Sequence, residues 1–279
     1  SFIGNICTVT FINHGEVVGN TIVLQLAATN NDNYEGVYKV TTVLDANNFT
    51  VVLRAVPPGP SGNISFVNSR SISSASFWEA GNFRLGAPYR IMSVGIGGNT
   101  TDKMRARLYS DVLSYKPDIV SIMGGTNDVR YGQTVAARDN AIVNLIWMAK
   151  QVLATGAIVK LWSILPITAA GQGFSLVTPL IVSMNESLAA FAAVTPGVIW
   201  VDGFSEVVDN TSTDNRAVTG YFVDDVHPNR IGCWRISRAD AVAMAKFSPP
   251  PMALVSGNGA SYVYSSQIKN RLNNPLFIR

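Results

Sequence analysis

The pattern of hydrophobic and polar positions changes near residue 62. Before it, short segments alternate apolar and polar residues and are rich in β-branched side chains, which is typical of strands with one buried face. The pattern predicts four such strands, at residues 7–11, 21–26, 38–43 and 49–53. The proline- and glycine-rich run 57–62 interrupts this pattern and is the clearest boundary in the chain. Residues 1–62 are therefore predicted to form a small all-β module.

After this boundary, short apolar runs alternate with segments of helical periodicity. The apolar runs predict strands at 90–94, 118–123, 157–164 and 198–202. The helical periods predict a helix that has Thr101 as its N-cap and ends before Pro117, and two more at 134–154 and 175–193. This alternation predicts an α/β domain over residues 63–250, with a doubly wound parallel sheet in a flavodoxin-like three-layer arrangement. Residues 251–279 are interpreted as a linker or the start of a further domain.

Composition narrows the class of protein. The chain has 279 residues, of which 47% are hydrophobic and 14% charged, so it can bury a sizeable core. It contains no run of about 18 apolar residues, so no membrane span is expected. Its 21 Lys+Arg against 18 Asp+Glu form no basic cluster, which argues against nucleic-acid binding. The two cysteines, Cys7 and Cys233, are too few for a disulfide framework or a cysteine metal site, and we expect them to be free.

Three polar clusters follow predicted strands or precede predicted helices. They are Gly95–Thr101, Gly124–Asp128 and Asp224–Pro228. The first could be an ordinary glycine turn, the second a helix cap, and the histidine of the third a structural residue. The first also lacks the lysine of a phosphate-binding loop. Because the carboxyl ends of parallel strands meet at one edge of a sheet, the three clusters could instead form a single site.

The order and spacing of these clusters resemble the SGNH (GDSL-like) hydrolase family. Gly98 matches the second sequence block of that family, Lys116–Val120 followed by Gly125–Asp128 matches the third, and Asp224–His227 matches the fifth. The resemblance covers about residues 77–245. It implies a serine esterase that needs no metal and no cofactor.

The resemblance also implies a role for each matching residue. His227 would be the general base and Asp224 the carboxylate that orients its ring. The side-chain amide of Asn127 and the backbone N–H of Gly98 would donate to the oxyanion of the reaction intermediate. Asp225 is a rival for the orienting role, but the three-residue offset of the family motif favours Asp224.

Other residues near these clusters receive weaker interpretations. Asp128 is expected to be a helix-capping partner, and Arg130 and Tyr131 could line a substrate cleft. In the β module, His14 is expected to be structural or exposed. Tyr34 and Tyr38 could stack on sugar rings, but packing is the favoured interpretation.

The nucleophile is the point at which this sequence departs from the family, because the first block, Gly-Asp-Ser, is absent. Ser71 lies in residues 64–73, which could be a strand followed by a degenerate block, and Ser1 could be the last residue of a severed motif. The favoured account places the serine before residue 1. In that account, residues 1–62 are an insertion between the serine and the first helix of the family, which Phe77–Phe83 would begin.

The β module is similar to small modules of bacteriophage tail and tailspike proteins, judging from the segments Thr8–Thr10, His14–Gly15, Tyr34–Tyr38 and Asp45–Thr50. This similarity predicts a virion or secreted protein, a homotrimer if it is part of a tailspike, and an acylated carbohydrate as substrate. The expected reaction is hydrolysis of an O-acetyl ester on a bacterial surface polysaccharide. Two alternatives stay open: a non-catalytic glycan-binding tail module, and a lipid esterase or thioesterase of the same family.

Overall fold

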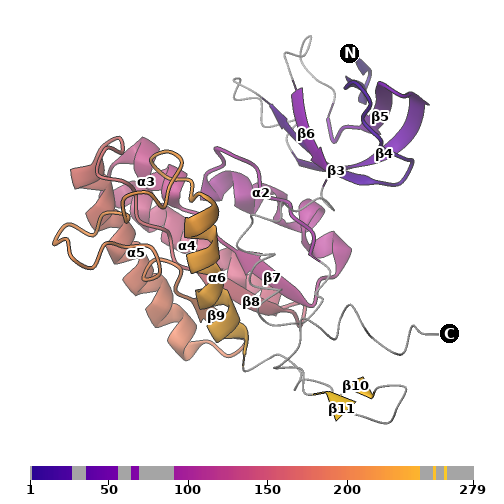
Figure 1. The fold of residues 1–279 in the computed structure, drawn as a ribbon. Coiled ribbons are helices and arrows are strands. Elements are labelled where there is room, and N and C mark those ends of the chain that lie inside the picture. The colour runs from indigo at the N-terminus through magenta and orange to yellow at the C-terminus, as the bar shows by residue number, and fades with distance from the viewer. Residues whose placement is uncertain are drawn as a thin grey trace.

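The computed structural model describes residues 2–26, 36–55, 64–68, 91–245, 254–255 and 261–262. The N-terminal part is an antiparallel sheet of six strands in the order β1-β2-β5-β4-β3-β6, which stands as a separate body beside the helices in Figure 1. Its strands are β1 (Phe2–Ile3), β2 (Ile6–Thr10), β3 (Thr21–Leu26), β4 (Gly36–Asp45), β5 (Asn48–Val52) and β6 (Ile64–Asn68). The four predicted strands correspond to β2, β3, β4 and β5.

Strand β6 corrects the boundary that was predicted at residue 62. It pairs antiparallel with β3, from Ile22↔Asn68 to Leu26↔Ile64, so the β module continues at least to residue 68. The proline-rich run precedes the last strand of the module and does not end it. This pairing also puts the strand before Ser71 in the antiparallel sheet, whereas a degenerate Gly-Asp-Ser block would need it in the parallel one.

The core of the β module explains two of its candidate residues. Tyr38 is 5% exposed and packs with Cys7 and Phe49, so it is a core residue and offers no open face to a sugar. His14 is structural: its Nδ1 accepts from the backbone N–H of Glu16 at 2.8 Å, and its Nε2 lies 3.0 Å from the carbonyl oxygen of Asp45. These partners require the neutral ring with its proton on Nε2. Tyr34 lies outside the described residues.

The second unit is a parallel sheet of three strands in the order β7-β8-β9, formed by Ile119–Ile122, Ile158–Trp162 and Val198–Val201. Its helices are α2 (Thr101–Asp111), α3 (Thr126–Gly132), α4 (Val135–Leu153), α5 (Phe174–Val194) and α6 (Arg230–Met244), with a 3-10 turn η1 (Leu113–Tyr115). The predicted helices 134–154 and 175–193 are α4 and α5, whereas α6 was not predicted. A short hairpin, β10 (Leu254–Val255) and β11 (Ser261–Tyr262), follows.

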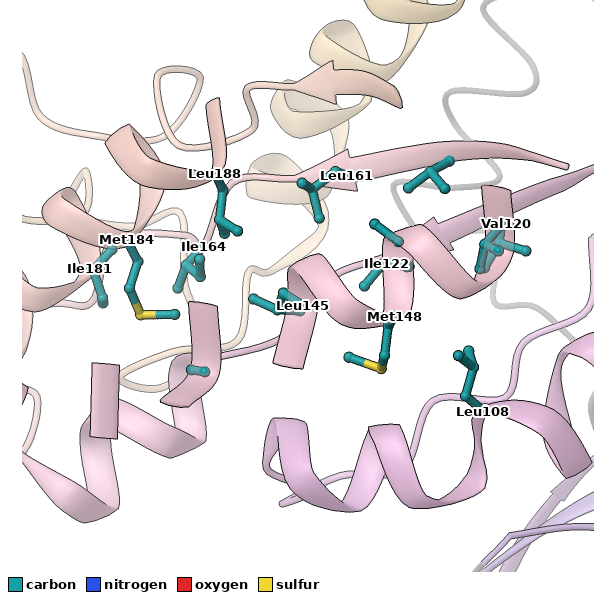
Figure 2. Packing of buried hydrophobic residues seen from close by; sticks show 14 of the residues in the cluster. Leu108, Val120, Ile122, Leu145, Met148, Leu161, Ile164, Ile181, Met184 and Leu188 are labelled. Carbon is teal, nitrogen blue, oxygen red and sulfur yellow. The ribbon is translucent and has the colours of Figure 1, made fainter. Parts of the chain in front are cut away.

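Side chains that alternate along the strands build a core on each face of this sheet. Val159 and Leu161 of β8 point to one face, where they pack with helices α2, α4 and α5 (Figure 2). Trp162 of the same strand points to the other face, where Ile236 of α6 covers it. Because helices lie on both faces, the three-layer α/β arrangement expected from the sequence is confirmed.

Two local expectations for this unit are wrong. Residues 91–94 form no strand, because the guanidinium of Arg107 takes the carbonyl oxygen of Val94 at 2.7 Å and Met92 and Val94 pack against a small apolar cluster with Val37 and Ile96. Thr101 is the first helical residue of α2 and not its N-cap, which is Thr100.

Within the described residues, α5 is the one helix whose length and composition would allow it to cross a membrane. Val177, Ile181, Met184 and Leu188 recur every three or four residues and are fully buried against the sheet. This single buried stripe is that of an amphipathic core helix. Cys7 and Cys233 form no disulfide, as expected.

Candidate active site

His227 and Asp224 form a hydrogen-bonded pair in the loop between β9 and α6. The ring Nδ1 of His227 lies 2.7 Å from Oδ2 of Asp224. The other carboxylate oxygen accepts from the backbone N–H groups of Val226 and His227, at 2.8 and 2.7 Å, which fixes the carboxylate in place. Among the described residues, Nε2 has no hydrogen-bond partner, and the His227 side chain is 70% exposed. The basic nitrogen is therefore accessible to a substrate or a nucleophile.

The carboxylate of Asp224 is held in its charged form. Partial desolvation opposes ionisation, but the hydrogen bonds from the His227 side chain and from the two backbone N–H groups outweigh it. They lower the pKa of Asp224 to about 2. At neutral pH this group is an anion next to Nδ1, where it can hold the proton on Nδ1 and stabilise an imidazolium.

Asp225 points to a different partner. Its Oδ1 accepts from the hydroxyl of Thr168 at 3.1 Å, and its carbonyl oxygen accepts from the Thr168 N–H at 3.0 Å. Thr168 lies in the loop that follows β8, so Asp225 fastens the His227 loop to that loop. The contact to His227 is made by Asp224.

Asn127 lies beside the turn that carries Gly98. Its Nδ2 donates to the carbonyl oxygen of Asn99 at 3.0 Å, which places the amide nitrogen and not its oxygen next to the turn. An amide nitrogen carries two hydrogens, so a second one remains for a substrate oxygen. Gly98 has φ +78°, a left-handed conformation that glycine favours, and a Cβ built on it would meet no atom within 4 Å. The backbone there is open to a ligand.

A cluster of charged side chains, partly buried, contacts the turn that carries Gly98. Arg107 of α2 donates from Nε to Oδ1 of Asn99 at 3.1 Å and from Nη1 to Oδ2 of Asp111 at 3.1 Å. Asp111 is fully buried, and its other oxygen pairs with Arg54, which follows β5 of the antiparallel sheet. The β module is thus linked to the Gly98 turn through Arg54, Asp111 and Arg107.

Asp128 is a capping partner, but for a helix other than its own. Its oxygens accept from the N–H of Thr101 at 3.0 and 3.1 Å and from the Thr101 hydroxyl at 2.6 Å, at the start of α2. Burial raises the pKa of this carboxyl, and the Thr101 hydrogen bonds oppose that rise. Asp128 therefore fixes the start of α2, directly after the Gly98 turn, to the helix that carries Asn127.

The two halves of the site follow neighbouring strands. Asn127 follows β7, and the His227 loop is fastened by Asp225 to the loop that follows β8, the strand paired with β7. Both halves are therefore fixed beyond the carboxyl ends of the parallel sheet, where α/β proteins place their active sites. Ser1, Ser71 and the expected helix from Phe77 to Phe83 lie outside the described residues.

Sequence reasoning missed the residues that support the site. Arg107 is 8 residues from its partner Asn99 in the sequence, and Thr168 is 57 residues from its partner Asp225. The residues that flank Arg107 and Thr168 in the sequence form no motif that would indicate these contacts. Asn99 lies in the glycine-rich cluster Gly95–Thr101, but nothing in the sequence assigns it a role. Tyr131 lies on α3 with a side chain that is 66% exposed. The described part of the chain contains no group of side chains that could hold a metal ion.

Comparison with known proteins identifies the class that this fold and site define. The GDSL-like lipase/acylhydrolase family matches residues 73–235, more than half of the chain. The chain belongs to this family.

Individual relatives are more distant. A 40-residue segment is 52% identical to an acetylxylan esterase of Geobacillus stearothermophilus and covers 14% of this chain, but the match spans only 18% of that protein. A GDSL-like lipase of Bacteroides thetaiotaomicron is similar in structure, with 26% identity, a TM-score of 0.50, and coverage of 55% of this chain and 74% of that one. A variant of the Geobacillus acetyl-xylooligosaccharide esterase shares the fold at 22% identity and a TM-score of 0.50, over 61% of this chain and 83% of that one.

Proposed function

We propose that this protein is a serine esterase that removes acetyl groups from carbohydrate, with a bacterial surface polysaccharide as the expected substrate. The observation that carries the proposal is the His227–Asp224 pair, with Nδ1 and Oδ2 2.7 Å apart and Nε2 exposed. The family membership of the chain and its similarity to an acetylxylan esterase support ester hydrolysis and a carbohydrate substrate.

In the proposed reaction, a serine oxygen attacks the ester carbonyl carbon while Nε2 of His227 takes the serine proton. The carbonyl oxygen becomes an oxyanion, which the free N–H of Asn127 and the backbone N–H of Gly98 stabilise. His227 then gives the proton to the leaving sugar hydroxyl, and an acetyl-serine remains. Water attacks this ester in the second half of the reaction, again with His227 as base, and acetate leaves.

The serine is the component to be identified by experiment. Ser1, Ser71 and a serine that precedes residue 1 in the complete protein are the candidates. Labelling the active esterase with a fluorophosphonate, followed by peptide mapping, should place the adduct on one serine. That labelling should disappear in His227→Ala, because the imidazole is needed to activate the hydroxyl.

The esterase proposal is tested with the complete protein on an aryl acetate and on an acetylated xylo-oligosaccharide. Acetate should be released from both, and His227→Ala should abolish the release. Full turnover by His227→Ala would refute the assigned role. A folded protein that binds glycans but releases no acetate would favour the non-catalytic tail module, and a preference for long-chain acyl esters would favour the lipid esterase.

We also propose that the protein acts as a part of a phage tailspike. The similarity of the β module to tail modules supports this. The proposal predicts a trimeric mass by light scattering for the complete protein, and a monomer at micromolar concentration would contradict it.

A further inference from the structure

A cavity of about 530 Å³ lies between the first turns of α5 and the loop at residues 213–215. Its volume is within the range of small-molecule sites, which is roughly 300–1,000 Å³. The wall contains none of the four residues assigned to ester hydrolysis. The cavity is therefore a second concave feature of the α/β unit, separate from the reacting groups.

The chemistry of the wall selects the class of ligand. The wall offers the Ser175 and Thr213 hydroxyls, the Asn215 amide, the Glu186 carboxylate and the ring of Phe174. Its second carboxylate, Asp214, is paired with Arg216, and neither Lys nor Arg is part of the lining. Arg138 donates to the hydroxyl of Ser183 in this wall. Glu186, however, forms no ion pair among the described residues, and this carboxylate disfavours phosphate and acidic sugars, because like charges repel. Hydroxyl, amide and carboxylate groups beside an aromatic ring suit a neutral carbohydrate.

The cavity adjoins both halves of the catalytic site through one loop. Residues 163–173 connect β8 to α5: Thr168 in the middle of this loop binds Asp225, and Phe174 directly after the loop lines the cavity. At the end of the loop, Gly173 lies against the side chain of Gln133, the C-cap of the helix that carries Asn127. A chain of sugars that leaves the His227 loop across this connection would reach the cavity.

We infer that this cavity binds a neutral sugar unit of the substrate chain at a distance from the acetyl group that is cleaved. The identity of the ligand as substrate rests on the proposed esterase function, whereas the binding itself does not require hydrolysis. The cavity would give the enzyme affinity for the polysaccharide in addition to its contacts with the acetyl ester.

The test uses unacetylated xylotetraose, cellotetraose and chitotetraose, whose binding to the full chain is measured by saturation-transfer NMR and calorimetry. At least one of them should bind. Ser175→Trp, which fills the cavity from an exposed position, should abolish that binding. Leu176→Trp is the matched control on the next residue of the same helix, because Leu176 is 56% exposed and does not line the cavity, and it should bind normally.

Two results would overturn the inference: binding of none of the three sugars, or equal binding by Ser175→Trp and Leu176→Trp. Concentration-dependent dimerisation that Ser175→Trp removes, without sugar binding, would assign the cavity to a second copy and also overturn it. Sugar binding by the complete protein without hydrolysis of an aryl acetate would leave this inference standing and refute the esterase proposal. Hydrolysis by the complete protein without sugar binding would leave the esterase proposal standing and overturn this inference.

Discussion

Arg107 reaches from helix α2 to the turn that carries Gly98, where its Nε donates to Asn99 Oδ1 over 3.1 Å. The same guanidinium holds the carbonyl oxygen of Val94 and the buried carboxylate of Asp111. The carbonyl oxygen of Asn99 in turn accepts from Asn127. Arg107 therefore positions both proposed oxyanion donors without touching the substrate.

We predict that Arg107→Lys lowers kcat of the esterase on an aryl acetate by roughly tenfold to a hundredfold, because a point-like ammonium cannot replace a planar fork with several fixed donors. KM should change little, because the turn binds the transition state more strongly than the substrate.

The matched control for this variant is Arg105→Lys on the same helix. Arg105 donates to Asn144 and lies over the ring of Trp147, and it makes no hydrogen bond with Asn99 or Asn127 among the described residues. The Arg105→Lys variant should have the same kcat as the unmodified protein. Equal losses in the two variants, with equal losses in stability, would show that Arg107 has only a structural role.

Asn127→Ala tests the oxyanion donor directly. Removing one such donor costs on the order of 10²–10³ in kcat, or about 3–4 kcal/mol of barrier. Steady-state kinetics on an aryl acetate should show this loss with KM nearly unchanged. A change confined to KM would contradict the assignment.

The depressed pKa of Asp224, about 2, predicts the pH dependence of the reaction. The carboxylate stays ionised from pH 4 to 9, so the titration of Asp224 should not contribute to the acid limb of kcat/KM. Asp224→Asn should lower kcat on the order of 10²–10⁴-fold, because the neutral amide neither stabilises an imidazolium nor fixes the proton on Nδ1.

Asp225→Asn serves as the comparison, since its side chain binds Thr168 and not the ring. It should retain much more activity than Asp224→Asn. The reverse order would assign the orienting role to Asp225. A second ionisation in the acid limb, above pH 4, would mean that Asp224 titrates in the working range.

The pairing of His227 with Asp224 was expected from the sequence because the resemblance to the SGNH family implies it, and the contact itself is local. Asp224 and His227 are three residues apart, and the loop between them returns two N–H groups to the carboxylate. The place of β6 could not be predicted in the same way. Its apolar pattern suits either sheet, and only the pairing with β3 decides between them. The non-strand conformation of residues 91–94 depends on Arg107, which contacts Val94 from the next helix.

The face of the sheet under α6 contains a buried ion pair that the sequence also did not reveal. Lys160 of β8 points to the same face as Trp162, where its ammonium pairs with Asp240 of α6. Burial raises the pKa of Asp240, and Lys160 opposes that rise by attraction and by a hydrogen bond. Lys160 and Asp240 are 9% and 3% exposed.

Breaking this pair should cost more stability than replacing it. Asp240→Asn leaves the Lys160 charge buried without its counter-charge, and we expect a loss of about 3–5 kcal/mol in the free energy of unfolding. The double variant Lys160→Met, Asp240→Leu removes both charges and should be close to neutral or more stable. Urea unfolding at pH 7 measures the free energy of unfolding of the unmodified protein, the single variant and the double variant. If the double variant lost as much as the single one, the pair would contribute a net attraction larger than its desolvation cost.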